Sequence, residues 1–185
     1  LTTGLFATDF LGGKIEGDAR LLYMDVNAKN VKGVDGNALG LGLTPQFTSS
    51  ELSAGIKVQV GLGIAVPVSE NENGVASNLA MGRNNSNGST ELYVVPTLYN
   101  FQYSKDNTKA IIGAQVLDTP LIGSNDIRLV KNTFTAIMGA YGVNDSLNLI
   151  AGYVVEMAGA VDGLAEDSQY FHAMSNQAIA KDAEG

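Results

Sequence analysis

The sequence has no cysteine and no tryptophan, a single histidine (His172), and few charged residues, which make up 16% of its 185 positions. Without cysteine there can be no disulfide scaffold, thiolate metal site or cysteine nucleophile. We expect His172 to be an ordinary loop residue, because no second histidine or acidic pair stands at metal spacing. Basic residues number 11 against 19 acidic ones, so we do not expect a nucleic acid partner, which requires clustered lysine and arginine.

Long apolar runs and catalytic motifs are also missing. No run reaches the ~18 apolar residues of a candidate transmembrane helix. The chain begins at Leu1 and does not open on a basic segment followed by an apolar one, so we expect a signal peptide to have been removed. Nucleotide-binding loops, nucleophile elbows and zinc-protease motifs do not occur. We therefore expect no enzymatic activity, cofactor or metal.

Apolar residues nevertheless make up 45% of the chain, and they recur with a period of two. Between residues 14 and 23 the even positions 14, 16, 18 and 20 are charged, and every odd position is apolar or glycine. The same alternation returns at residues 54–65 and 147–157, and more weakly elsewhere. This period predicts strands with one polar and one apolar face.

We expect seven strands, at residues 14–26, 38–47, 54–66, 91–103, 108–117, 133–141 and 146–157. Their connections alternate between long and short, which is typical of an antiparallel barrel with long loops at one end and short turns at the other. In the strand at 91–103 the alternation is ambiguous. We place its tyrosines and phenylalanine outward, and Pro96 then requires a bulge or an unpaired amide.

The face opposite the apolar one combines glycines such as Gly61 and Gly63 with polar residues such as Lys57 and Gln59. We expect this face to line water and to pack against nothing. A soluble β-sandwich or small barrel also alternates, with its apolar face turned inward around a core. The pattern alone therefore leaves a membrane barrel and a soluble β-domain as alternatives.

One segment carries a specific motif. Residues 113–134 read GAQVLDTPLIGSNDIRLVKNTF, and they resemble a signature of OprD-type bacterial outer-membrane porins. In that family a strand ending in Gly-Arg-Gln runs into Leu-Asp-Thr-Pro, then Asn-Asp-Ile-Arg, then Pro-Asn-Thr-Phe. Ala114 stands in place of the family's arginine and Lys131 in place of its proline. The strands at 14–23 and 147–159 also resemble the family, so the likeness covers most of residues 14–163.

The resemblance implies an all-β fold, an antiparallel up-and-down transmembrane β-barrel. Residues 1–185 would be the N-terminal portion of it, about seven or eight strands of a larger barrel, with no separate second domain. The implied function is passive, selective diffusion of small polar solutes or ions through a water-filled channel in the outer membrane of a Gram-negative bacterium. Its partners would be the lipid bilayer, lipopolysaccharide and those solutes, and a homo-oligomer is one open alternative. The rival is a soluble or filament-forming structural β-protein that assembles through open strand edges.

Polar side chains on the inward faces, and those of the loop at 118–132, are the candidates for lining the pore and setting selectivity: Lys14, Glu16, Asp18, Arg20, Lys57, Gln59, Asp118, Asp126, Arg128 and Glu156. The charges at 14–20 project to one side about 6.6 Å apart. They would either create a transverse field or neutralise one another. The family folds a loop into the channel where 118–132 lies, which implies that Asp126 and Arg128 border a constriction. The alternative is plain loop structure, with Asp118 capping a turn.

Overall fold

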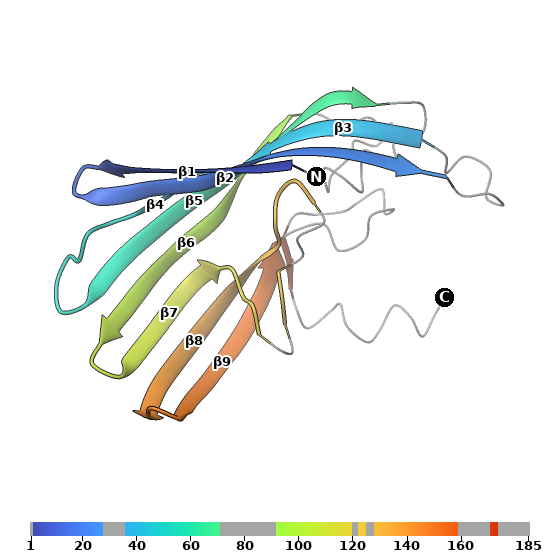
Figure 1. Cartoon of the computed structure of the whole chain (residues 1–185). Coiled ribbons are helices and arrows are strands. Elements are labelled where there is room, and N and C mark those ends of the chain that lie inside the picture. The colour runs from blue at the N-terminus through green and yellow to red at the C-terminus, as the bar shows by residue number, and fades with distance from the viewer. Residues whose placement is uncertain are drawn as a thin grey trace, which may run out of the picture.

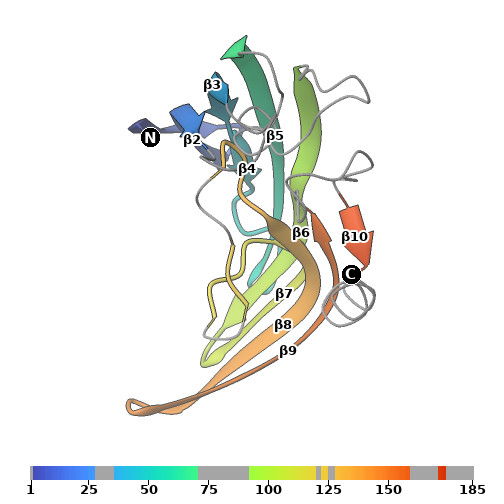
Figure 2. The ribbon, with the colours of Figure 1, turned by 90° about the vertical axis from the view of Figure 1, so that its right-hand side faces the viewer.

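A computed structural model describes residues 2–27, 36–70, 92–119, 122–124, 128–158 and 171–173. The strands are β1 (Thr2–Phe10), β2 (Gly13–Val26), β3 (Gly36–Leu43), β4 (Gln46–Thr48), β5 (Ile56–Glu70), β6 (Tyr93–Lys105), β7 (Thr108–Gln115), β8 (Thr133–Asn144), β9 (Leu147–Ala158) and β10 (Phe171–Ala173). They form one antiparallel sheet in which neighbours in sequence pair side by side, and β3 and β4 share the place between β2 and β5. Figures 1 and 2 show that this sheet is strongly curved.

The prediction of an all-β antiparallel fold is confirmed, and each expected strand has a counterpart. The strand expected at 38–47 is interrupted at Thr44 and Pro45, between β3 and β4, since proline has no amide hydrogen for the ladder. The predictions missed β1, and His172, expected in a loop, lies in the short strand β10. No helix in the described part of the chain is long and apolar enough to cross a membrane.

The short turns lie at one end of the sheet, and the strands lead into the long connections at the opposite end, as the sequence predicts. The two-residue turn between β1 and β2 uses positive φ at Leu11 (45°) and Gly12 (73°), which suits the twist of a tight hairpin. Asp106 has a φ of 51° in the turn between β6 and β7. Figure 1 shows these turns, and those after β4 and β8, at the same end of the sheet.

The convex face of the sheet is apolar and exposed. One cross-strand row joins β5 to β9 through direct register partners: Val58, Phe101, Ile112, Ile137 and Tyr153. Phe101 is 63% exposed and Tyr153 is 71% exposed, although both are large apolar side chains. Nothing in the described part of the chain covers this row, so the apolar face of the strands is turned away from the protein.

A bulge in β6 changes the alternation within that strand. Between β5 and β6, Gly61 pairs with Leu98 and Leu62 with Pro96, which leaves Thr97 as the extra residue. Of the two alternatives expected at Pro96, a bulge or an unpaired amide, the register shows a bulge next to it. Tyr99 and Phe101 are exposed on the outward side as expected. On the other side of the bulge the parity is reversed. Val94 is 53% exposed, while Val95 belongs to a buried cluster on the inward face.

Candidate functional site

The connection between β7 and β8 folds back onto the concave face of the sheet (Figure 2). Leu129 is 0% exposed and Val130 is 4% exposed, and they pack against Leu22 of β2, Ala65 of β5 and Val95 of β6. We name the described residues 128–132 of this connection the inner segment. It lies against strands that precede it in the chain by more than 60 positions in the case of Ala65, so it is held by the sheet and not by its own neighbours.

Glycines on the inward face make room for the inner segment. A Cβ at Gly42 would lie 2.7 Å from the Leu129 carbonyl oxygen, and a Cβ at Gly63 would lie 2.5 Å from Cγ1 of Val130. Distances this short exclude any side chain at these two positions unless the inner segment moves. The prediction that the glycine-rich face lines water and packs against nothing is therefore wrong here, because the glycines seat the loop.

The first part of the same connection is a small hairpin. The Ser124 amide donates to the Leu117 carbonyl at 2.8 Å, and the Thr119 amide donates to the Ile122 carbonyl at 2.9 Å. The Thr119 hydroxyl caps the turn by donating to that carbonyl at 2.8 Å. Leu117 and Ile122 pack on Phe134 in a second buried cluster. The hairpin is thus anchored to the sheet by its apolar side chains.

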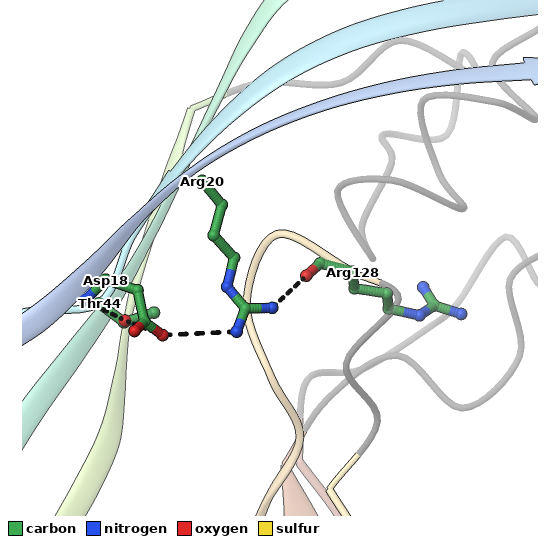
Figure 3. A network of polar contacts seen from close by, with 4 residues as sticks. All are labelled: Asp18, Arg20, Thr44 and Arg128. Carbon is green, nitrogen blue, oxygen red and sulfur yellow. Dashed lines mark hydrogen bonds and ion pairs between the residues drawn. The ribbon is translucent and has the colours of Figure 1, made fainter. Parts of the chain in front are cut away.

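The inward charges of β2 pass from exposed to buried as they approach the inner segment. Lys14 and Glu16 form an ion pair and their side chains are 52% and 37% exposed. Asp18 is 23% exposed and Arg20 only 4%, and their ion pair measures 3.4 Å. The Arg20 Nη1 donates to the Arg128 carbonyl oxygen at 3.2 Å. Figure 3 shows this contact between β2 and the loop, with the Arg128 side chain directed away from the Arg20 guanidinium.

Thr44 extends this network to the break between β3 and β4. Its hydroxyl donates to Asp18 Oδ2 at 3.4 Å, and its amide donates to the Asp18 carbonyl at 2.9 Å. Asp18 therefore has Thr44 on one side and Arg20 on the other (Figure 3). The charges at 14–20 thus form two neighbouring ion pairs, Lys14 with Glu16 and Asp18 with Arg20.

Uncharged amides form a second network on the inward faces of β5 and β6. Gln59 Oε1 accepts hydrogen bonds from Asn100 Nδ2 at 3.0 Å and from Gln102 Nε2 at 3.1 Å. Asn100 Nδ2 also donates to the Ala114 carbonyl of β7 at 2.7 Å. Lys57, which pairs with Gln102, is exposed next to this network. Gln59 and Lys57 thus lie on the inward face that their alternation predicts.

A recess of about 540 Å³ lies where the inner segment meets the strands, and its lining includes Glu16, Asp18, Thr97, Val130 and Lys131. Acidic side chains come from β2 and a basic side chain comes from the loop. Charged side chains that line a narrow zone contribute to the selectivity of a channel.

The three predicted site residues of the loop differ in their surroundings. Asp118 is exposed, and its backbone forms an isolated bridge with Gly123 in the hairpin. Arg128 is 6% exposed, so it lies within the loop's packing. Asp126 lies outside the described residues.

The placement predicted for Glu156 on the inward face is wrong. The register pairs Glu156 with Thr135 and Val154 with Ala136, so Val155 is an extra residue in β9. Val154 packs in the inward cluster, and Thr135 pairs with Ala114, which is the partner of Tyr99 on the outward face. Because directly paired residues share a face, the bulge turns Glu156 outward.

Several residues of this site were not among the sequence candidates, and Lys131, Lys109 and Asn100 are three of them. In the sequence Lys131 stands out only because it replaces the proline of the family motif, and that departure is the one signal that could have pointed to it. Lys109 pairs with Ala140 on the inward face, near the short turns. Asn100 is 3% exposed, and its role could not be read from a sequence in which the parity of β6 is ambiguous. No group of residues that could hold a metal ion occurs in the described part of the chain.

The fold and the loop together define one part of the wall of an antiparallel β-barrel that carries an inward-folded connection. No family model and no curated protein sequence matches the chain. Solved structures do match. OccAB1 of Acinetobacter baumannii is 20% identical with a TM-score of 0.65, and the match covers 80% of this chain and 35% of that one.

Two channels of Pseudomonas aeruginosa are similar to the same degree. OccK9 (OpdG) is 17% identical with a TM-score of 0.67, and the match covers 82% of this chain and 40% of that one. OccK8 (OprE) is 16% identical with a TM-score of 0.68, and the match covers 86% of this chain and 36% of that one. All three are OprD-family outer-membrane channels. The chain shares their fold and spans less than half of their length.

Proposed function

We propose that this chain forms part of the wall of an outer-membrane channel through which small polar solutes or ions diffuse passively. The observation that carries the proposal is the inverted distribution of side chains. The convex face of the sheet exposes large apolar residues such as Phe101 and Tyr153, while charged and amide side chains lie on the concave face. Such a sheet suits lipid outside and water inside, because lipid-facing and lumen-facing residues alternate along each strand of a membrane barrel.

Two further observations support the same function. The motif at residues 113–134 resembles OprD-type porins, and the fold is that of channels in this family. The connection that carries the motif folds onto the concave face. It occupies part of the space that would otherwise be open to a solute, and so it narrows the proposed channel. In this proposal the inner segment sets the narrowest part of the channel, and Glu16, Asp18 and Lys131 face the solute there.

Lys14, Lys57 and Gln59 have a different part in the proposal. They lie nearer the short turns, on the exposed portion of the concave face, and they would meet the solute in the wider portion of the channel. Asp118 and Asp126 belong to the same connection as the inner segment, and we propose that they line the approach to it. The match to OpdK, a Pseudomonas aeruginosa protein crystallised with vanillate, suggests small carboxylates as solutes to test first.

The test is the conductance of the full-length protein in planar lipid bilayers after extraction in detergent. We expect discrete current steps under an applied voltage, without ATP or another chemical energy source. We also expect proteoliposomes to swell when they are placed in an isotonic solution of a small permeant solute. A protein that stays in solution without detergent, forms fibres and never conducts would instead support the structural β-protein that assembles through its strand edges.

A further inference from the structure

Arg20 differs from the other charged residues on the inward face of β2 in two respects. Its side chain is 4% exposed, whereas that of Lys14 is 52% exposed. It also contacts the inner segment, which is 108 positions further along the chain. A guanidinium in this position is screened from the solute by the loop, and Asp18 neutralises its charge at 3.4 Å.

The geometry of the contact requires two separated donors. Nη1 donates to the Arg128 carbonyl oxygen at 3.2 Å, and Nη2 faces Asp18 Oδ2 at 3.4 Å (Figure 3). Arginine presents its donors in a rigid planar fork, whereas lysine carries one flexible ammonium group. A lysine at position 20 keeps the charge but cannot span both acceptors in this arrangement.

We propose, resting on the proposed channel function, that Arg20 is a positioning residue that fastens the inner segment to β2. It thereby sets the width of the channel and not its preference for cations or anions. Asp18 accepts from the guanidinium on the opposite side, and the Thr44 hydroxyl donates to the same carboxylate. The close packing of Leu129 on Gly42 and of Val130 on Gly63 provides a second, apolar attachment of the same segment.

The first experiment replaces Arg20 with lysine in the full-length protein. We expect the inner segment to detach more often. Hydrogen exchange of the backbone amides at 128–132, followed by mass spectrometry, should become about 10- to 100-fold faster, the factor that a hydrogen bond to a charged group contributes. The unitary conductance should rise or fluctuate, while the reversal potential in a salt gradient stays unchanged because the charge is kept.

Lys14→Gln is the matched comparison for a charge that faces water. This variant removes the cation beside Glu16, so we expect a shift of the reversal potential toward cation preference with no change in exchange at 128–132. If Arg20→Lys leaves both the exchange rate and the conductance as in the parent, the inference is overturned. The same holds if it shifts the reversal potential as Lys14→Gln does.

A pair of cysteines distinguishes detachment of the inner segment from a general disturbance of the fold by Arg20→Lys. A Cβ at Gly63 would lie 2.5 and 3.3 Å from the methyl carbons of Val130. Cysteine at position 130 has a single γ atom in place of these two methyl carbons, so cysteines at positions 63 and 130 can be joined by a disulfide, and the double-cysteine protein serves as its own parent in both redox states. The chain has no other cysteine. In this background the effects of Arg20→Lys should vanish on oxidation and return on reduction.

Effects of Arg20→Lys that persist undiminished in the oxidised protein would contradict a fastening role. The parent protein separates this inference from the proposed function. If the parent conducts no ions, the channel proposal fails, while the exchange measurement on Arg20→Lys still decides whether Arg20 holds the inner segment.

Discussion

Gly63→Ala tests the seating of the inner segment on β5. The added Cβ would lie 2.5 Å from Val130 Cγ1 and 2.8 Å from Thr97 Cγ2, whereas carbon atoms pack at about 3.5–4.0 Å. One of the partners must therefore move by about an ångström. Extra atoms in a well-packed site cost about 1–3 kcal/mol, so the free energy of unfolding should fall.

Gly139→Ala in β8 is the matched control. A Cβ there meets nothing closer than 4.0 Å. Replacing glycine with alanine stabilises a protein by about 0.4–1 kcal/mol through the unfolded chain, and this contribution is common to both variants. The difference between Gly63→Ala and Gly139→Ala therefore isolates the clash, and we expect about 1–3 kcal/mol.

The assay is unfolding by guanidinium chloride in detergent micelles, followed through the 7 tyrosines of a sequence that has no tryptophan. Val130→Ala removes both methyl carbons near Gly63 and should restore part of the stability of Gly63→Ala, while Thr97 still limits the rescue. Equal stability of Gly63→Ala and Gly139→Ala would refute the placement of the inner segment against β5.

Three other predictions concern the two faces of the sheet. Asn100→Ala removes a buried donor to Gln59 and to a carbonyl of β7 and should lower the free energy of unfolding by about 1–3 kcal/mol, whereas Asn148→Ala, at an exposed position, should change it little. Ile137→Arg places a charge on the convex face, which the proposed function puts in contact with lipid, and it should cost about 2–4 kcal/mol when the protein is unfolded from lipid vesicles. Gln59→Arg, on the inward face, should cost clearly less, and equal costs would count against the assigned faces. Lys57→Gln should shift the reversal potential in a salt gradient toward cations, and an unchanged potential would remove Lys57 from the wall of the channel.

The alternation of apolar residues was sufficient to predict most of the strands and their faces. In β2 the even positions from 14 to 20 are charged and the odd positions are apolar or glycine, so the pattern predicts which face of the strand points inward. In the structure Arg20 is buried on the inward face and Leu21 is exposed on the outward face. In β1 the pattern is weak, because Leu5 and Ala7 on one face oppose Phe6 and Thr8 on the other. Without a polar face to recognise, that strand could not be predicted.

Bulges and long-range packing limited what could be predicted about the site. The extra residue Val155 turns Glu156 outward, and nothing in the local sequence marks this bulge. Leu129 and Val130 read as two apolar residues in a loop, and their burial depends on the distant glycines Gly42 and Gly63. The family motif indicated which connection folds inward, but only the structure shows where that connection packs on the sheet.

Single cysteines along β8 test the central claim most directly, because the protein has none of its own. In lipid vesicles, cysteines at positions 137 and 141 should react with a lipid-soluble maleimide and resist a charged, water-soluble one, since Ile137 and Tyr141 are exposed on the convex face. A cysteine at position 140, on the opposite face, should react with the charged reagent. Reaction of all three positions with the charged reagent would contradict a convex face in contact with lipid.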